Sequence, residues 1–402
     1  MKKILQILLV AFFALTAQDM YSCTSAIITG KLTPDGRPLL YKNRDTGELN
    51  NRVEHFTGFK YNFLALVNSP DSTGIAWAGT NSVGFSIMNT ASYNLKNDNV
   101  KDMDKEGEVM FKALAECKTL KDFEKMLNKM PKPWGVEANF GVIDANGGAA
   151  YYEVNNTTWT KIDVNDPKIA PDGYLVYTNH SYTGRYNDGM GYIRYNTANK
   201  TFMDRVPFAN ITPSWIMDNI SRSFYHSLLD IDLVKDMDKI GNSGFFIDQD
   251  FVPRRSTSAV VIVQGVKPEQ DPSETVMWTS LGYPPVAVTV PVMEKYAELI
   301  PDYMTKTTTS NNAEFCDLSL LLKKQIFPIT RGNGKHYFKF SLLYNNEGTG
   351  YTQILKSVDK TIENDFNEVV KKIKNNDEFT TALIDFYRTV GKNVIETYNK
   401  IL

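Results

Sequence analysis

Short apolar runs separated by glycine, asparagine and proline dominate the chain from residue 23 to residue 94. The runs TSAIITG, LLYKN, FLALVN, GIAWAGT and GFSIMNT are divided by turn-forming segments such as TPDGRP, a pattern that predicts the hairpins of one sheet. Apolar residues then recur at helical spacing between Gly107 and Met130, which predicts two helices broken near Thr119.

Strand-like runs return after the segment PKPWG. In NFGVIDANGGAAYYEV, the DANGG turn between alternating apolar runs predicts a hairpin, and WTKIDV, GYLVYTNHS, SAVVIVQGV, TVMWTSL and YPPVAVTVPVM predict further strands. Residues 212–234 read as one helix, and residues 311–402 read as largely helical. The order strands, helices, strands, helices favours a layered α+β fold over an alternating parallel one.

The first 22 residues have the pattern of an export signal, with two lysines, a mostly apolar core over residues 4–17 and a polar end. Cleavage after residue 17 would instead leave residues 18–22 as a short propeptide. No later stretch approaches about 18 uncharged apolar residues, so no membrane-spanning segment is expected. The sequence therefore predicts an exported chain, periplasmic or secreted.

The rest of the chain reads as one domain with an extension. Hydrophobic residues make up 42% of the sequence, enough for a sizeable core. We expect a globular domain over residues 23–300 and a mainly helical extension over residues 301–402 packed on it. The formal net charge is −2, and neither a basic patch nor an acidic tail indicates a nucleic-acid partner.

The three cysteines are too few for a disulfide framework, and an odd number leaves at least one thiol unpaired. Cys117 and Cys316 lie in segments of helical spacing and are expected to be ordinary buried or helix-face residues. Cys23 lies where the leader is expected to end, and it requires another explanation.

Several large enzyme classes lose support because their motifs are missing. The sequence has no G-x-S-x-G, no G-x-x-x-x-G-K-[ST], no G-x-G-x-x-G and no H-E-x-x-H. The four histidines are widely scattered, which is a poor pattern for metal ligands. No metal and no cofactor are expected.

If processing leaves Cys23 at the new N-terminus, one residue carries both a thiol and a free α-amine. The amine titrates near about pH 8, so its neutral form can take the thiol proton directly or through a water. Such a site also needs a group that holds the amine, donors for an oxyanion and a nearby cation.

The run YKNRDTGE offers Asp45 at the end of a strand to hold the amine, with Lys42 and Arg44 as cations beside it. A charged turn that closes a hairpin is the alternative interpretation of this run.

Asparagines that follow strands are candidate oxyanion donors, although each is also a common turn residue that bonds its own backbone. They are Asn179 in LVYTNHS and both Asn81 and Asn89 in GTNSVGFSIMN. Arg254 and Arg255 precede the strand SAVVIV, either as cations of a site or as solvated side chains.

Taken in order, these segments carry a family resemblance. CTSAIITGKLTPDGRPLLYKNRD resembles the N-terminal signature of cysteine N-terminal-nucleophile hydrolases, namely choloylglycine hydrolases, penicillin V acylases, acid ceramidase and its amidase relatives, and isopenicillin N acyltransferases. The likeness extends over about residues 23–290 through GTNSVGFSIMN, FGVIDANGGAAYYEV and YTNH. The TNH triplet, which includes His180, is similar to the acyltransferase branch.

The resemblance implies a four-layer αββα sandwich of antiparallel sheets, here with a helical C-terminal extension that the family does not usually carry. It also implies a role for each candidate. Cys23 is nucleophile and base, Asp45 holds its amine, and Asn179 forms the oxyanion hole with Asn89 or Asn81. On the substrate side it implies binding residues among Lys42, Arg44, Asn81, His180, Arg254 and Arg255, with one of the two arginines as the family's late arginine.

One departure concerns Lys42, because the family more often has arginine or glutamine there and lysine cannot form a bidentate fork. The resemblance further implies a small-molecule N-acyl amide as substrate, with acyl transfer as a variant of the hydrolysis. Bile-acid conjugates, N-acyl amino acids, fatty amides and β-lactam side chains all fit that description. Relatives are often tetramers, so homo-oligomers are compatible with the family.

The alternative hypothesis is a surface lipoprotein that binds a ligand or a glycan without catalysis, with its lipid on Cys23. Lipidation consumes both the thiol and the amine, so the two hypotheses exclude each other. Tyr21 is tolerable in a lipid-attachment motif, but Met20 fits it poorly, and the apolar core ends several residues early, at Ala17.

Mass spectrometry of the mature N-terminus separates these cases. We expect a chain that begins at unmodified Cys23. An acylated Cys23, or a stable mature chain that retains residues 18–22, would contradict catalysis by a free Cys23 amine.

Overall fold

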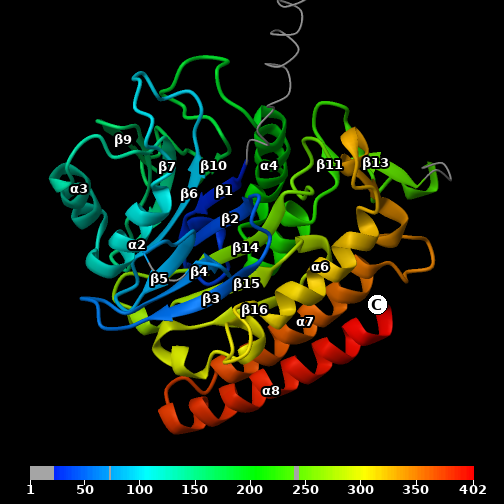
Figure 1. The fold of residues 1–402 in the computed structure, drawn as a ribbon. Helices are drawn as coiled ribbons and strands as arrows, with labels where there is room; N and C mark the ends of the chain where they lie inside the picture. The colour runs from blue at the N-terminus through cyan, green and yellow to red at the C-terminus, as the bar shows by residue number, and fades with distance from the viewer. Residues whose placement is uncertain (1–21, 72–73, 240–243) are drawn as a thin grey trace, which may run out of the picture.

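The computed structural model describes residues 22–71, 74–239 and 244–402, so the predicted leader lies outside the described residues apart from Ser22. Two antiparallel sheets form its centre (Figure 1). The six-stranded sheet has the order β10 (Tyr174–Tyr177), β1 (Thr24–Ile28), β2 (Leu39–Asp45), β14 (Thr257–Gln264), β15 (Val276–Leu281) and β16 (Thr289–Val292). The seven-stranded sheet runs in chain order, with β3 (Asn51–Phe56), β4 (Phe63–Asn68), β5 (Ala78–Asn81), β6 (Ser86–Ala91), β7 (Ala138–Ile143), β8 (Ala149–Val154) and β9 (Trp159–Asp163).

The sheets pack face to face through contacts of β1 and β2 with β6, of β2 with β7 and of β14 with β5. Successive side chains along a strand point to opposite faces of the sheet, so apolar residues are present on both faces. In β8, Tyr151 joins the core between the sheets, whereas its neighbour Tyr152 joins a second core beneath the outer helices.

Helices cover the outer face of each sheet. The seven-stranded sheet carries α2 (Glu106–Glu116) and α3 (Leu120–Lys129). The six-stranded sheet carries α4 (Tyr192–Arg205), α5 (Pro213–Ile216), α6 (Glu314–Ile326), α7 (Tyr351–Val370) and α8 (Asn376–Ile401). These four layers confirm the predicted αββα fold class.

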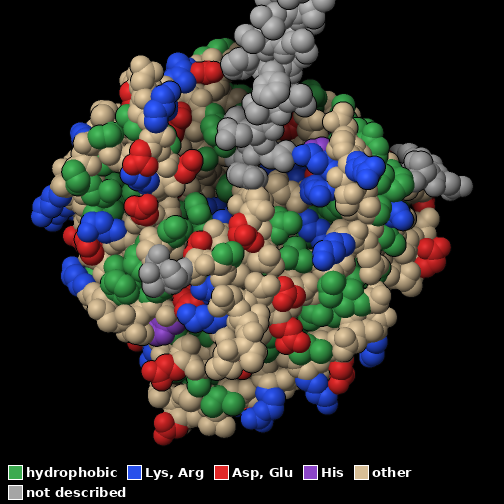
Figure 2. All heavy atoms as spheres, viewed as in Figure 1, with side chains coloured by type: hydrophobic (Ala, Val, Ile, Leu, Met, Phe, Trp, Pro, Cys, Tyr) green, Lys and Arg blue, Asp and Glu red, His purple; other side chains and the backbone are tan. Residues whose placement is uncertain are grey.

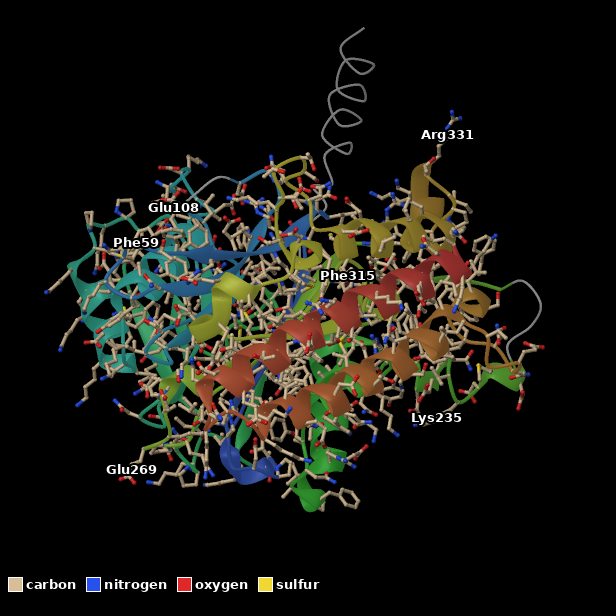
Figure 3. The ribbon with its side chains drawn as sticks, turned by 90° about the horizontal axis from the view of Figure 1, so that it is seen from below. Phe59, Glu108, Lys235, Glu269, Phe315 and Arg331 are labelled. Carbon is tan, nitrogen blue, oxygen red and sulfur yellow. The ribbon has the colours of Figure 1, made fainter. Side chains whose placement is uncertain are left out.

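Helices of the C-terminal extension share one hydrophobic core with the six-stranded sheet, because buried residues from Ala26 to Tyr398 belong to the same cluster. Figure 3 shows α7 and α8 side by side across one side of the molecule. On the face seen in Figure 2, acidic and basic side chains are interspersed, as the near-zero net charge suggests. None of the helices in the described ranges is long and apolar enough to cross a membrane.

The predicted helix break is confirmed. Thr119 is the N-cap of α3, where its side chain accepts a hydrogen bond from the Asp122 backbone and Asp122 bonds back to the Thr119 backbone. This capping box starts a new helix directly after α2 ends.

The prediction of one helix over residues 212–234 is wrong beyond residue 221. After α5 and a π-helical turn (Met217–Ser221), the chain forms the short hairpin of β11 (Tyr225–His226) and β12 (Ile231–Asp232). Its Leu228 and Leu229 are exposed, whereas Phe224 and Leu233 on either side of the hairpin are buried in the core, so the apolar residues of this segment do not form one helical face. The predicted helical tail is likewise interrupted by β17 (Tyr337–Lys339), which pairs with β13 (Phe245–Ile247).

The sequence pattern gave no sign of α4. Its sequence, YIRYNTANKTFMDR, lacks an apolar stripe, because the positions it buries include Arg194 and Thr197 as well as Ala198 and Phe202. A helix that buries polar side chains against a polar site does not have the periodicity from which helices are predicted.

A buried ion pair ties α7 to this fold. Arg222 is 1% exposed and donates to Asp359 at 2.5 Å, and the other Asp359 oxygen accepts from the backbone of Thr289 in β16. Asp359→Ala is expected to lower the free energy of unfolding by about 3 kcal/mol, because it leaves a buried guanidinium without this partner. Urea unfolding measures the change. Asp365→Ala, at an exposed position of the same helix, is the control, and equal stability of both variants would contradict the prediction.

Candidate active site

The start of β1 is the meeting point of the predicted site residues. Cys23 is 9% exposed and immediately precedes this strand, which is flanked by β10 and β2. Thr24 pairs with Asn43 in β2, and the antiparallel register with β10 runs toward Asn179, just beyond that strand. Segments far apart in the sequence therefore converge on Cys23.

Asp45, the last residue of β2, lies buried in a network of donors. Its Oδ1 accepts a hydrogen bond from Thr257 Oγ1 at 2.5 Å, and its Oδ2 forms an ion pair with Arg254. Arg254 Nη2 also donates to the carbonyl oxygen of Ser22 at 2.6 Å. The arginine thus links the carboxylate to the peptide unit that contains the nitrogen of Cys23. Burial opposes the charge of Arg254, but Asp45 outweighs it and raises the pKa of the guanidinium.

Arg255 takes a different direction, so only one arginine of the predicted pair reaches this site. Its backbone nitrogen donates to Asp248 at 2.6 Å, and its guanidinium donates to the carbonyl of Lys335 at 2.8 Å. Arg255 therefore fastens the segment before β14 to the C-terminal extension.

Asn179 is held by a residue that the sequence analysis missed. Arg194 of α4 donates to Asn179 Oδ1 at 2.9 Å, and it also donates to the carbonyl of Cys23 at 2.7 Å and to Thr24 Oγ1 at 2.8 Å. The Asn179 amide nitrogen donates to the carbonyl of Ala91 at 2.8 Å. Arg194 thereby fixes both the backbone of Cys23 and the orientation of the asparagine amide.

Burial lowers the pKa of Arg194 to about 9, with Arg254 acting in the same direction and Asp45 opposing both. Only its place on the fold distinguishes Arg194 from the other arginines, since it lies on the helix that the sequence pattern did not predict. No motif in the sequence marks it.

Lys42 and Asn89 form a second pair of site residues. Lys42 Nζ donates to Asn89 Oδ1 at 2.7 Å and to the carbonyl of Trp77 at 2.8 Å. The guanidinium of Arg44 lies 4.7 Å from the centre of the Trp77 ring. Lysine at this position therefore orients an asparagine amide instead of forming a bidentate fork.

The charge state of Cys23 affects the pKa of both Lys42 and Arg44. Burial lowers the pKa of Lys42 to about 8 and that of Arg44 to about 10, and a negative charge on Cys23 opposes the shift in each case.

Asn81 makes its side-chain hydrogen bonds outside this cluster. Its side-chain nitrogen donates to the carbonyls of Leu114 and Cys117 at the end of α2, and its Oδ1 accepts from the backbone nitrogens of Val83 and Phe85. Every polar atom of this side chain is thus used in holding the turn between β5 and β6 against α2.

His180 follows Asn179 directly and packs among aromatic rings. Its Nδ1 lies 3.2 Å from Thr178 Oγ1, and its ring stacks on Tyr192 with centroids 4.4 Å apart. Burial lowers the pKa of this imidazole, which keeps the ring neutral near pH 7. His180 is therefore arranged for packing beside the site.

The other two cysteines are buried, as the sequence analysis expected. Cys117 belongs to the core beneath α2 and α3, and Cys316 lies on the inner side of α6. All three cysteines are free thiols. Nowhere in residues 22–71, 74–239 and 244–402 does a group of three or more His, Cys, Asp or Glu side chains form an arrangement that could hold a metal ion.

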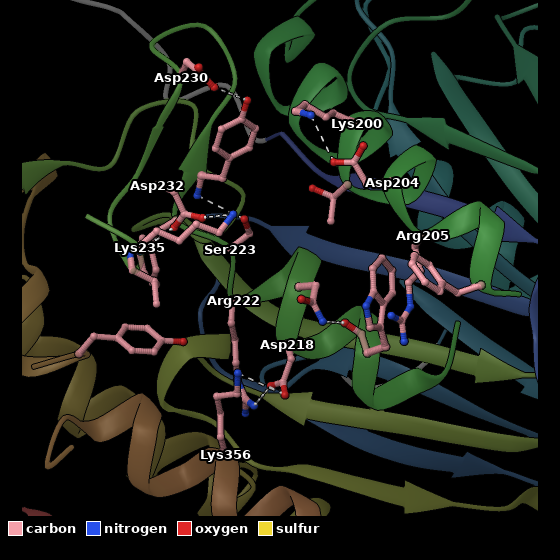
Figure 4. Close-up of a pocket in the computed structure, with 18 residues that line it drawn as sticks. Lys200, Asp204, Arg205, Asp218, Arg222, Ser223, Asp230, Asp232, Lys235 and Lys356 are labelled. Carbon is pink, nitrogen blue, oxygen red and sulfur yellow. Dashed lines mark hydrogen bonds and ion pairs between the residues drawn. The ribbon is translucent and has the colours of Figure 1, made fainter. Parts of the chain in front are cut away.

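A separate cavity of about 540 Å³ lies on the helical side of the six-stranded sheet (Figure 4). Its lining charges are largely paired, including Lys200 with Asp204 and both Arg222 and Lys356 with Asp218. None of the predicted site residues lines this cavity.

The two packed sheets and their outer helices define the αββα class of protein. No family model matches the sequence, and no curated protein matches it. Among solved structures, the chain is similar to an N-acylethanolamine-hydrolyzing acid amidase ortholog of Caenorhabditis elegans, at 12% identity over 49% of this chain and 89% of the other, with a TM-score of 0.34.

It is also similar to penicillin V acylase of Agrobacterium tumefaciens, at 11% identity over 68% of this chain and 86% of the other, with a TM-score of 0.34. A conjugated bile acid hydrolase of Clostridium perfringens matches at 12% identity over 68% of this chain and 92% of the other, with a TM-score of 0.35. By name, the three are an acid amidase, an acylase and a conjugated bile acid hydrolase.

Lys42 gives the site a dependence on pH. Its pKa is depressed in the folded state, so between about pH 8 and its ordinary value the unfolded chain binds a proton that the folded chain does not. Stability therefore rises with pH in that window, by at most about 1.4 kcal/mol per pH unit. We expect this rise between about pH 8 and about 10 in the unmodified protein and in the exposed-site control Lys31→Met, and a smaller rise in Lys42→Met. Identical slopes of unfolding free energy against pH in all three would contradict it.

Proposed function

We propose that this chain is an exported hydrolase of linear amide bonds that uses the thiol of Cys23 as nucleophile once Cys23 is the N-terminal residue. The observation that carries the proposal is the bridge from Asp45 through Arg254 to the carbonyl of Ser22. That carbonyl oxygen and the nitrogen of Cys23 belong to one planar peptide unit, so Arg254 connects the buried carboxylate to the peptide group that processing would cut. After processing, the same nitrogen is a free amine, and we propose that Asp45 holds it.

The chemistry follows from these groups. The neutral Cys23 amine takes the thiol proton, and the thiolate attacks the carbonyl carbon of the amide. The tetrahedral intermediate collapses as the C–N bond breaks, and the α-ammonium returns the proton to the leaving amine. Water then attacks the thioester, with the amine again as base, and releases the carboxylic acid. Acyl transfer replaces this water by a second amine.

Two asparagine amides are the proposed oxyanion donors. Because Lys42 occupies Oδ1 of Asn89, the Nδ2 group of that amide is the one left for a substrate oxygen. Asn179 has its Oδ1 fixed by Arg194, and one N–H of its Nδ2 group donates to the carbonyl of Ala91, so the second N–H is the proposed donor to the oxyanion. Fixed amide dipoles of this kind stabilise the charge that develops in the transition state.

The same thiol is suited to removing the segment before it. Attack of Cys23 Sγ on the Ser22 carbonyl carbon forms a thioester while the peptide C–N bond breaks and the nitrogen gains a proton. Water then releases the segment that ends at Ser22. Arg254 already donates to the oxygen that would carry the negative charge, which supports processing by the chain itself.

We further propose a small-molecule N-acyl amide as the substrate and the periplasm or the exterior as its location, from the sequence features of the leader and the N-terminal signature. The competing lipoprotein hypothesis needs a lipid chain on a sulfur atom whose residue is only 9% exposed at the start of a central strand. Burial of Cys23 therefore favours the hydrolase.

The test combines variants with a substrate panel of conjugated bile acids, N-acyl amino acids, fatty amides and penicillins. The mature protein is expected to release the amine from at least one of these classes. Cys23→Ala is expected to lower kcat by at least about a thousandfold, because both steps pass through the sulfur, and Cys23→Ser is expected to leave a trace. Cys117→Ala, which removes a buried thiol elsewhere, is expected to retain activity. Full turnover by Cys23→Ala would overturn the proposal.

A further inference from the structure

Helix α6 of the C-terminal extension reaches beneath the proposed catalytic carboxylate. Lys323 Nζ donates to the backbone carbonyl of Thr257 at 2.8 Å. The hydroxyl of the same Thr257 donates to Asp45 and accepts from the backbone nitrogen of Arg254 at 2.9 Å. One lysine thus holds the residue on which both members of the Asp45–Arg254 pair depend.

A second attachment starts about two turns earlier on the same face of α6, at Cys316. The thiol of Cys316 accepts a hydrogen bond from the backbone nitrogen of Asn51 at 3.4 Å, and Asn51 Oδ1 accepts from the guanidinium of Arg44. The extension therefore contacts the supports of two consecutive residues of β2, Arg44 and Asp45.

A third attachment lies in the segment after α6. His336 Nδ1 lies 3.0 Å from Asp248 Oδ1, and Asp248 Oδ2 accepts from the backbone nitrogen of Arg255, the neighbour of Arg254. The loop that delivers Arg254 is therefore held from the extension as well.

Burying the ammonium group of Lys323 costs more free energy than a purely packing role would require. It is 4% exposed, and its ammonium lies 5.3 Å from the centre of the Tyr283 ring. An apolar side chain of similar volume would avoid the desolvation of a buried cation. Local features that cost stability without a compensating gain in packing tend to mark functional sites.

The charged surroundings of Lys323 point the same way. Burial lowers its pKa to about 7, and the charge that most opposes this shift is that of Asp45. Cys316 and Asp248 also favour the ammonium form, whereas Arg255 disfavours it. Among these neighbours, the proposed amine-holding carboxylate is thus the strongest partner.

We propose that Lys323 is a positioning residue of the active site, which fixes Asp45 through Thr257 and makes the C-terminal extension part of the catalytic unit. This inference rests on the proposed role of Asp45 in holding the Cys23 amine. Asp45 acts on the nucleophile and not on the substrate, so its displacement lowers kcat and leaves KM nearly unchanged.

The experiment uses the mature full-length chain and two readouts. The first is the rate of Cys23 alkylation by iodoacetamide at pH 7.5, which needs no substrate and is measured by mass spectrometry of the Cys23 peptide. The second is kcat and KM on any amide that the protein cleaves. Lys323→Met removes the donor, Lys323→Gln keeps an N–H donor, and Lys324→Met at the exposed neighbouring position is the matched control.

Lys323→Met is expected to lower both the alkylation rate and kcat at least fivefold with KM within twofold, while Lys323→Gln stays within threefold of the unmodified protein and Lys324→Met matches it. Equal rates in all four proteins, or equal losses in Lys323→Met and Lys323→Gln, would overturn the inference. If Lys323→Met does not fold, Thr257→Val against Thr257→Ser tests the same relay from its other end, with loss expected only in the valine variant. An unmodified protein without amidase activity would instead refute the proposed function, and the alkylation rates would still judge the inference.

Discussion

The buried ion pair between Asp45 and Arg254 is the contact on which the rest of the site depends. A carboxylate that is 2% exposed requires compensation, and it receives a guanidinium and a hydroxyl at the point where β2 and β14 end side by side. Because β1 lies on the other side of β2, the same pair also borders the start of β1. The geometry around Cys23 is therefore a consequence of strand order.

The surroundings of this pair are rich in cations. Lys42, Arg44 and Arg194 are each at most 3% exposed, and burial depresses the pKa of every one of them. Such a concentration of buried positive charge opposes folding, and it suits the negative charges of the proposed reaction, first on sulfur and then on the oxyanion. Each of the three side chains also donates to an asparagine, so charge and orientation are set by the same residues.

The C-terminal extension gives this charged region its support. Its helices share the core of the six-stranded sheet, and its segment around residues 316–336 bonds to the backbone that carries Asp45 and Arg254. The C-terminal extension thus supplies both the packing against the outer face of the sheet and the polar contacts near the end of β2. Because the extension both packs against the six-stranded sheet and bonds to its backbone, it can keep in place a buried polar cluster that is costly in free energy.

The sequence by itself determined the class of fold, and it proposed most of the side chains that the structure brings together around Cys23. Alternating apolar runs with turn residues between them predicted most strands, and the odd number of cysteines drew attention to Cys23. The spacing of apolar residues predicts individual strands and helices, because an element that buries one face has apolar residues at a regular period along the chain. Only the tertiary structure separated Asn89 from Asn81 and Arg254 from Arg255, since neighbours of the same type differ only in what their strand or turn faces. It alone revealed Arg194, because a polar residue buried by distant segments leaves no periodic signal along the chain.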